Sequence, residues 1–283
     1  MFFCFGYTNI RFFGRIISLE DDYKSRFIVS LGMQTAIIIG ATSGIGRELA
    51  VRLAKAGWTV GVAGRREERL SSLAAQFPEG VIRTQVLDIT IPEATDALDA
   101  LLLKTGAPDL FLHVSGVGKQ NPRIDEAVEM QIIETNCSGM VRMVSHFVNY
   151  VKRNPAYHEG HKAQIAVVTS VAGTAGLGVS AAYSASKKMQ STYISALSQL
   201  SRMEGIPVRF TDIRPGFVAT EILGAEHNYP FIMPVEKAAD HILKGLRRKR
   251  RVITFDWKFR LVVGLWRLIP RGLWERMTFI KTR

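Results

Sequence analysis

The fold is decided by residues 37–50, which read Ile37-Ile38-Ile39-Gly40-Ala41-Thr42-Ser43-Gly44-Ile45-Gly46-Arg47-Glu48-Leu49-Ala50. An apolar run leads into a turn that contains three glycines, and a helix-forming segment follows it. Glycines let a backbone turn tightly and approach a pyrophosphate closely, while the N–H groups and dipole of the following helix stabilise negative charge. The stretch predicts a dinucleotide-binding turn formed by Gly40, Thr42, Ser43, Gly44, Ile45 and Gly46. The alternative is a strand-to-helix turn that uses its glycines for geometry alone.

Short apolar runs alternate with longer amphipathic segments from residue 34 onward, which is typical of repeated strand–helix–strand units. Most runs are continuous Ile/Val/Leu, as expected for parallel strands that helices cover on both faces. We therefore expect a Rossmann-like, doubly wound parallel sheet in a three-layer α/β/α domain. The expected strands are Thr35–Ile39, Thr59–Val62, Ile82–Val86, Leu110–Val114, Ile165–Val168 and Arg209–Ile213. The expected helices are Gly46–Ala56, Arg66–Gln76, Thr95–Lys104, Ile124–Val151 and Tyr183–Glu204.

The positive charge of the chain is concentrated in one segment. A formal net charge of +12 would favour a nucleic-acid partner if it were spread over the molecule. Residues 244–283 hold 13 basic and 2 acidic side chains, whereas residues 33–243 hold 20 of each. We therefore expect no nucleic-acid partner. We divide the chain into an N-terminal extension at 1–32, a single α/β domain at 33–250 and a basic, tryptophan-rich tail at 251–283. The extension is expected to be poorly ordered, unless Met33 is the natural start.

Composition excludes several classes of protein. With 47% hydrophobic and 22% charged residues, the chain of 283 residues can form a core, which excludes intrinsic disorder. Cys4 and Cys137 cannot form a disulfide framework, so a cytoplasmic location is the default. No stretch reaches the roughly 18 uncharged apolar residues that a membrane-spanning helix needs.

A pair of arginines follows the second expected strand. The sequence Gly64-Arg65-Arg66 lies about 20 residues past the glycine turn, where such folds place the residue that contacts the ribose. An acidic side chain there would bond the 2′-hydroxyl of NAD, whereas a guanidinium suits a 2′-phosphate. Arg65 and Arg66 therefore favour NADP over NAD. The alternative is that they simply begin a solvated helix with the charged residues that follow.

A second group of residues points to proton transfer. Tyr183 and Lys187 are four apart in an expected helix, so they project from the same face. A nearby cation lowers the pKa of a tyrosine from about 10 and suits it to act as a base. Ser170 ends a strand and can hydrogen-bond a substrate oxygen. This set fits hydride transfer between a carbinol or carbonyl carbon and a nicotinamide, with Tyr183 moving the proton.

Six motifs in this order resemble the classical short-chain dehydrogenase/reductase (SDR) family over residues 34–250. They are Gly40/Gly44/Gly46, Asp88, Asn136, Ser170, Tyr183/Lys187 and Pro215-Gly216-Phe217-Val218-Ala219-Thr220. The resemblance implies that Asp88 and Ile89 lie near the adenine and that Val218 and Thr220, after Pro215 and Gly216, hold the carboxamide. It implies that Asn136 completes a catalytic tetrad by holding a relay water near Lys187, which also binds the nicotinamide ribose. It further implies a homodimer or homotetramer paired through the fourth and fifth helices.

The chain departs from the family pattern after its fourth strand. The family usually has Asn-Asn-Ala-Gly, and this chain has His113-Val114-Ser115-Gly116. Gly116 keeps the close backbone approach to the cofactor, and we interpret His113 as structural rather than as an additional acid or base. The pair His158 and His161 lies in a polar stretch without further ligands nearby, so we expect a solvated loop and no metal site.

The tail has the composition of an interfacial membrane anchor. It holds three of the four tryptophans, and a helix over 259–269 would present a narrow basic stripe on an otherwise apolar surface. The alternatives are a segment that covers the substrate cleft and one that packs between subunits. The residues after Thr220 are also mostly apolar, which favours a lipophilic substrate. They include Ile222, Leu223, Tyr229, Phe231, Ile232 and Met233.

Together these interpretations predict an NADP-dependent oxidoreductase that interconverts a carbonyl and a secondary alcohol. Its catalytic residues would be Asn136, Ser170, Tyr183 and Lys187, and its substrate a small, lipid-like molecule. We expect a cytoplasmic enzyme that also contacts the membrane surface. The alternative function is a sensor or scaffold that binds a dinucleotide without chemistry.

Overall fold

The computed structural model of the chain describes residues 34–158, 160–223, 232–255, 264 and 268–277. The expectation for the extension at 1–32 lies outside the described residues, as does most of the helix expected at 259–269. Among the described residues, seven strands form one parallel sheet in the order β3-β2-β1-β4-β5-β6-β7, which confirms the doubly wound α/β fold. The strands are β1 Thr35–Ile39, β2 Thr59–Gly64, β3 Ile82–Val86, β4 Leu110–His113, β5 Ala163–Val168, β6 Val208–Arg214 and β7 Val252–Thr254.

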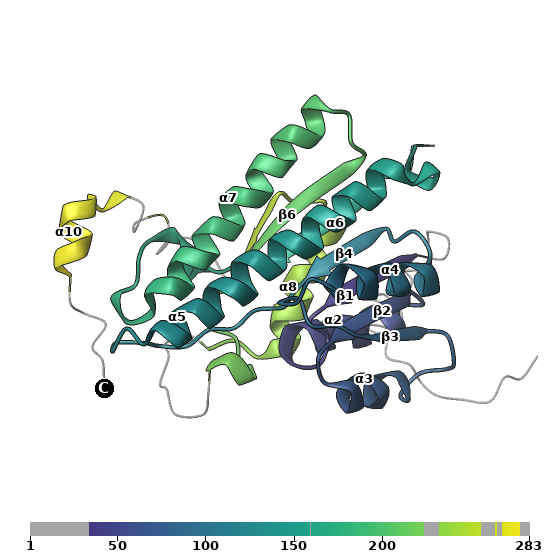
Figure 1. Cartoon of the computed structure of the whole chain (residues 1–283), viewed down its shortest axis with the longest axis horizontal. Coiled ribbons are helices and arrows are strands. Elements are labelled where there is room, and N and C mark those ends of the chain that lie inside the picture. Colours follow the sequence, from purple (N-terminus) through teal and green to yellow (C-terminus); the bar gives the residue numbers. More distant parts are fainter. Residues whose placement is uncertain (1–33, 159, 224–231, 256–263, 265–267, 278–283) are drawn as a thin grey trace, which may run out of the picture. The chain divides into compact units, whose positions relative to one another are not determined.

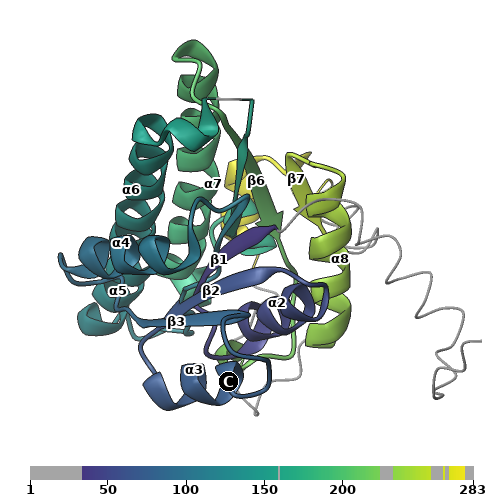
Figure 2. The ribbon, with the colours of Figure 1, turned by 90° about the vertical axis from the view of Figure 1, so that its right-hand side faces the viewer.

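Helices cover both faces of the sheet. Figure 2 shows α4, α5, α6 and α7 on one side of the strands and α2, α3 and α8 on the other. The helices are α2 Gly44–Lys55, α3 Glu67–Ala74, α4 Ala94–Thr105, α5 Glu126–Ile133, α6 Met140–Arg153, α7 Ala181–Met203, α8 Val235–Arg247 and α10 Arg271–Arg276. Side chains of a strand alternate between its faces. Accordingly Ile38 of β1 belongs to the apolar core under α2, and Ile37 and Ile39 belong to the core under α4 and α6.

The structure differs from the expected elements in the fourth helix. A π-helical turn at Glu134–Gly139 divides the segment expected as one helix at Ile124–Val151 into α5 and α6. A π-helical turn carries one more residue per hydrogen-bonded ring than an α-helix, so apolar periodicity does not reveal it. Asn136 lies inside this turn and is fully buried.

The end of the domain also differs. The elements expected from the sequence include neither α8 nor β7, and residues 252–254 of β7 fall within the segment assigned to the tail. Ile213 of β6 pairs with Ile253 of β7. A Cβ at Gly245 of α8 would lie 2.4 Å from Cδ1 of Ile253, so α8 packs directly on this strand. Phe255, directly after β7, is also buried, and the part of the chain that belongs to the sheet therefore extends to residue 255.

The topology fixes where a ligand can bind. From β1 the chain proceeds outward through β2 to β3, and it then returns to the other side of β1 with β4 (Figure 1). Helices that follow strands on opposite sides of this point leave a crevice at the carboxyl ends of β1 and β4. The glycine turn of residues 40–44 and the segment 114–118 lie at these two strand ends.

Candidate active site

A cavity of about 460 Å³ lies at the carboxyl ends of the central strands. The sequence-predicted residues that line it are Gly40, Thr42, Ser43, Gly44, Ile45, Arg65, Arg66, Asp88, Ile89, Gly116, Ser170, Tyr183, Lys187, Pro215, Gly216, Val218 and Thr220. Two predicted residues, Gly46 and Asn136, are not among the lining residues and are buried. The structure thus brings together, around one cavity, residues that are up to 180 positions apart in the chain.

The glycine turn places the start of α2 against the cavity. Gly40 and Gly44 adopt φ angles of +95° and +52°, which favour glycine. A Cβ at Gly46 would lie 2.1 Å from the carbonyl oxygen of Gly40, so a side chain there would push α2 away from the turn. The N-terminus of this 12-residue helix therefore faces the cavity and offers unpaired N–H groups and a positive dipole end to an anion. These features fit the phosphates of a dinucleotide.

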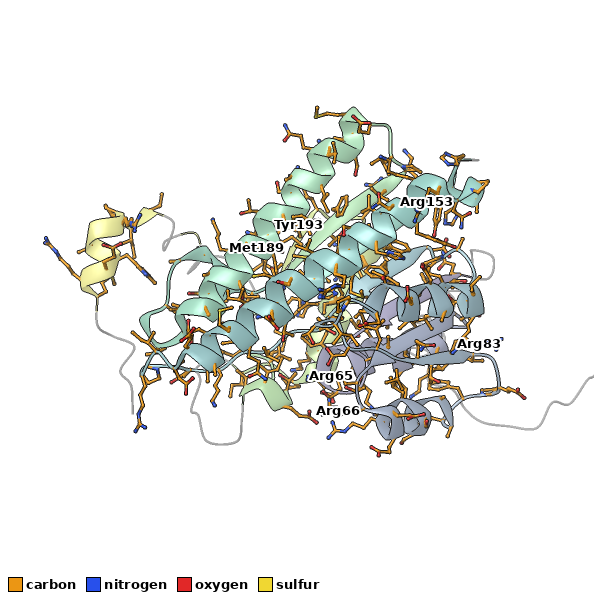
Figure 3. All side chains as sticks on the ribbon, in the orientation of Figure 1. Arg65, Arg66, Arg83, Arg153, Met189 and Tyr193 are labelled. Carbon is orange, nitrogen blue, oxygen red and sulfur yellow. The ribbon has the colours of Figure 1, made fainter. Side chains whose placement is uncertain are left out.

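Arg66 is anchored to the glycine turn. Its Nη2 donates to Oγ1 of Thr42 and to Oγ of Ser43, both at 2.8 Å, and its Nε also donates to Thr42. Figure 3 shows Arg65 and Arg66 where β2 leads into α3. Arg65 and Arg66 both line the cavity, and the three hydrogen bonds to Thr42 and Ser43 hold the guanidinium of Arg66 against the glycine turn.

Asp88 lines the same cavity after the end of β3, the strand that pairs with β2. Partial burial acts to raise the pKa of its carboxyl, but hydrogen bonds from the N–H and hydroxyl of Thr90 and the charge of Arg65 outweigh this effect. The pKa of Asp88 therefore lies below its usual value, and the carboxylate is available as a hydrogen-bond acceptor at neutral pH.

Lys187 is a buried ammonium beside Tyr183. Its Nζ lies 5.7 Å from the centroid of the Tyr183 ring. It donates to the carbonyl oxygen of Val168 at 3.1 Å and to Oε1 of Gln190 at 3.0 Å. Burial lowers the pKa of Lys187 to about 8, against the opposing influences of Cys137 and Asp212. The side chain is thus mostly protonated at neutral pH, and it places a positive charge beside the ring of Tyr183.

Ser170 reaches the same cavity from the end of β5. Its Oγ accepts a hydrogen bond from the N–H of Ala172 at 3.1 Å, which fixes the hydroxyl at the start of a short 3₁₀ turn. That bond uses one acceptor site and leaves the hydroxyl hydrogen able to turn toward a ligand. Ser170 can therefore donate to an oxygen held between it and Tyr183.

Asn136 and Gln190 form a polar layer beneath the cavity. The side chain of Asn136 exchanges two hydrogen bonds with the backbone of Val117, at 2.9 and 2.8 Å, and its Nδ2 donates to Ser186 at 3.0 Å. Gln190 donates from Nε2 to the main-chain carbonyl of Asn136 at 2.7 Å. Because Gln190 also accepts from Lys187, one buried amide links the ammonium to the π-helical turn. The resemblance assigns a relay water to this region, and the structure adds a glutamine side chain there.

Gln190 and Glu221 are site residues that the sequence motifs do not identify. Gln190 lies three positions after Lys187 on α7, so helical spacing indicates its contact with Lys187 but not its hydrogen bond to Asn136. Glu221 directly follows Thr220 and lines the cavity mouth together with Ile222 and Leu223. Nothing in the local sequence pairs this carboxylate with α3, because the contact spans more than 150 residues.

His113 is fully buried at the end of β4. Neither ring nitrogen has a hydrogen-bond partner among the described residues. Burial, with a smaller contribution from the charge of Lys187, lowers the pKa of His113 to about 3. The ring is therefore neutral at physiological pH, which favours a structural role over general acid catalysis.

Comparisons with known proteins point to one family of enzymes. A family model described as short chain dehydrogenase matches residues 34–228. An uncharacterized oxidoreductase of Myxococcus xanthus is 33% identical over 255 residues, which cover 88% of this chain and 97% of that protein. Sulfoacetaldehyde reductase 2 of Chromohalobacter salexigens is 36% identical over 193 residues, which cover 65% and 73% of the two chains.

Solved structures share the fold. A 3-ketoacyl-(acyl-carrier-protein) reductase of Brucella melitensis, complexed with NADH, is similar with a TM-score of 0.71 and 21% identity, over 79% of this chain and 96% of that one. A short-chain dehydrogenase of Sphingobium yanoikuyae, in complex with NADPH, is similar with a TM-score of 0.69 and 20% identity, over 89% of this chain and 99% of that one. At these identities the likeness establishes the common fold.

The burial of Lys187 predicts a pH-dependent contribution to stability. Its pKa is about 8 in the folded chain and 10.5 ordinarily, so between these values the unfolded chain keeps a proton that the folded chain has released. Stability rises with pH wherever the unfolded state binds more protons. The cost of burying the ammonium is therefore present in full below pH 8 and disappears as the pH rises to 10.5.

We expect the variant Lys187→Met to lack this dependence. Its free energy of unfolding relative to the wild type should fall by up to about 3 kcal/mol between pH 7 and pH 10.5. Urea denaturation at several pH values measures the difference, with Lys188→Met at the exposed neighbouring position as control. A difference that stays constant with pH would contradict a depressed pKa.

Proposed function

Since the chain belongs to the short-chain dehydrogenase family, we propose that it interconverts a carbonyl and a secondary alcohol with NADP as its cofactor. Membership in this family makes it an oxidoreductase of the CH–OH/C=O class that uses a nicotinamide dinucleotide. The finer proposal rests on one observation: Ser170, Tyr183 and Lys187 line the same cavity as the glycine turn and Arg66. A carbonyl compound held there would contact both the proton donors and the cofactor.

The proposal assigns a role to each polar group of the site. The nicotinamide, when bound, supplies or accepts the hydride. Tyr183 transfers the proton to or from the substrate oxygen, and Ser170 donates a hydrogen bond that polarises it. Lys187 favours the phenolate of Tyr183 and can bond the nicotinamide ribose. Asn136 supports the relay beneath them, through contacts that also fix Gln190.

The remaining cofactor contacts are proposed from the cavity lining. Gly40, Gly44 and Ile45 lie where the pyrophosphate would meet the start of α2, and Gly46 permits the close packing of this helix. A Cβ at Gly116 would lie 3.2 Å from Oδ1 of Asn136 and 3.4 Å from Nζ of Lys187, so the glycine lets this segment pack closely on both side chains. The residues proposed at the two ends of the cofactor are Asp88 and Ile89 at the adenine, and Pro215, Gly216, Val218 and Thr220 at the carboxamide.

Tyr183 is needed for turnover if the protein is an enzyme, and it has no such role if the protein only binds a dinucleotide. We expect Tyr183→Phe to lower kcat for carbonyl reduction by about 10²- to 10⁴-fold, because the ring then has no proton to transfer. Its affinity for NADPH, measured by nicotinamide fluorescence, should stay within about twofold of the wild type, since charge and volume hardly change. A panel of carbonyl compounds followed by NADPH absorbance supplies the substrate. Undiminished turnover by the variant would refute the role of Tyr183.

The preference for NADP is proposed from the position of Arg66. Its guanidinium is fixed by Thr42 and Ser43 beside the end of β2, where the 2′-position of the adenosine ribose is expected. A planar guanidinium bonds a phosphate through two parallel N–H groups, and a ribose hydroxyl gains much less from it. Arg65 adds a second positive charge at the same rim.

We expect Arg66→Ala to weaken NADPH binding by about tenfold to a hundredfold, because charge-assisted hydrogen bonds contribute about 1.5–3 kcal/mol. NADH binding should change little. Arg83→Ala removes the same charge from an exposed position on β3, away from the two cavity arginines (Figure 3), and serves as the matched control. Equal losses for the two cofactors, or a wild type that prefers NADH, would overturn the NADP assignment.

The segment after residue 255 is proposed to contact an anionic membrane surface from a cytoplasmic location. The composition of the tail supports this role, and Leu268 and Leu273 are exposed among its described residues. One contact favours the alternative that the segment covers the cleft. Nε1 of Trp274 donates to the carbonyl oxygen of Gly176, which lies between Ser170 and Tyr183 in the sequence. The exposed Ile222 at the cavity mouth supports a lipophilic substrate under either arrangement. Among the described residues, the structure contains no helix long and apolar enough to cross a membrane.

Pairing into a homodimer or homotetramer is proposed through α5, α6 and α7. Met130 of α5 and Leu200 and Met203 of α7 are exposed apolar side chains on these helices. Light scattering on the purified protein measures the mass of the assembly.

We expect a variant truncated after Phe255 to lose sedimentation with vesicles that contain anionic phospholipid, while the full chain sediments and is released by salt. The cut leaves β7 and the buried Phe255 in place, so the sheet is retained. Neutral vesicles are the control. If both proteins bind equally and the truncation instead raises KM for the substrate, the segment covers the cleft.

A further inference from the structure

Glu221 connects the two ends of the cavity rim. It directly follows Thr220, in a short 3₁₀ turn at Glu221–Leu223. Its Oε2 accepts from Nη1 of Arg66 at 2.8 Å, and its Oε1 accepts from Nη1 of Arg69 on α3. The segment that follows β6 is thereby attached to the arginines that follow β2.

The carboxylate of Glu221 bonds the arginine that is proposed to hold the 2′-phosphate. Arg66 uses Nε and Nη2 on Thr42 and Ser43, and its remaining group, Nη1, points to Glu221. A 2′-phosphate that takes the outward side of this guanidinium meets a carboxylate already there. Two anions cannot share one Nη1 without mutual repulsion.

The ion pairs are strong enough to form but weak enough to be displaced. The side chains of Arg66, Arg69 and Glu221 are 41%, 45% and 54% exposed. Ion pairs at such exposure contribute little because water screens them. Hydrogen bonds from Arg66 and then Arg69 hold the pKa of Glu221 at about 2, so it is ionised throughout the physiological range. A phosphate, with nearly two negative charges and three acceptor oxygens, is the stronger ligand for these arginines.

We propose that Glu221 is a specificity-determining residue that competes with the 2′-phosphate of NADP for Arg66 and Arg69. This inference rests on the proposed NADP preference and deepens it. Binding of NADP breaks the ion pairs of Glu221 with Arg66 and Arg69, which costs free energy, whereas binding of NAD leaves them intact. Glu221 therefore reduces the preference for NADP over NAD that Arg66 creates. It thereby determines the ratio of the affinities for the two cofactors.

The same displacement connects the cofactor end to the substrate end. Ile222 and Leu223 adjoin Glu221 and line the cavity mouth. When the 2′-phosphate replaces Glu221, these residues lose their attachment to α3. Binding of NADP, unlike binding of NAD, therefore releases the segment Glu221–Leu223 from the ion pairs with Arg66 and Arg69.

Direct binding tests the proposal without a substrate. Dissociation constants for NADPH and NADH are measured by nicotinamide fluorescence on the wild type and on Glu221→Gln, which keeps the side-chain size and removes the charge. We expect NADPH to bind Glu221→Gln about three- to tenfold more tightly, as expected from the loss of one or two exposed ion pairs. NADH affinity should change by less than about twofold, because its 2′-hydroxyl does not displace a carboxylate.

Two controls separate competition from a general electrostatic effect. Glu68→Gln removes the same charge from an exposed position in the first turn of α3 and should leave both constants within about twofold. Adenosine 2′,5′-bisphosphate and AMP, compared by calorimetry, isolate the 2′-phosphate, and only the former should gain affinity in Glu221→Gln. Glu221→Ala is a second variant that should give the same result.

The outcomes distinguish this inference from the function on which it rests. If the wild type binds NADPH well and Glu221→Gln binds it no more tightly, the competition is refuted and the NADP assignment stands. Equal gains for NADPH and NADH, or an equal gain from Glu68→Gln, refute it as well. If the wild type does not bind NADPH, both proposals fail.

Discussion

The architecture of the site depends on keeping one ammonium group charged inside the protein. Lys187 is almost completely buried, and transfer of a charge from water into the interior is costly unless hydrogen bonds replace the lost hydration. The carbonyl of Val168 and the amide of Gln190 provide this compensation. The amide of Gln190 is in turn fixed by the carbonyl of Asn136. The ammonium of Lys187 is thus stabilised by groups from three elements: the π-helical turn, the end of β5 and the first turns of α7.

The same charge adds to the effect of burial on one neighbouring histidine. His113 lies at the end of β4, within the electrostatic influence of Lys187, and a second cation in that buried space would be strongly disfavoured. The ring of His113 therefore stays neutral, as does the asparagine that the family pattern has at this position. The replacement of Asn by His changes the local hydrogen bonding and adds no further charge to the site.

Those features of the fold that depend on local pattern could be predicted from the sequence. Buried parallel strands form continuous apolar runs, so six strands were placed correctly, and the glycine turn required no distant partner to be interpreted. β7 was missed because it has only three residues directly after a basic run, where charge obscures the apolar signal. Gln190 and Glu221 were missed for a different reason. Their importance comes from contacts with residues 54 and 155 positions away, and no local spacing encodes such contacts. The catalytic and cofactor-binding roles stay predictions, although the cavity unites nearly all the residues selected for them.

The short strand β7 has a consequence for the behaviour of the protein in solution. Within the part of the chain that the structure describes, it is one of the two outer strands of the sheet, and an outer strand exposes backbone groups to which another chain can add. β7 is only three residues long and directly follows the cations from Arg247 to Arg251. Short length and adjacent positive charge both discourage strand addition between molecules, since two such edges repel each other. Part of the basic run therefore protects the sheet from edge-to-edge aggregation, whatever the rest of the tail binds.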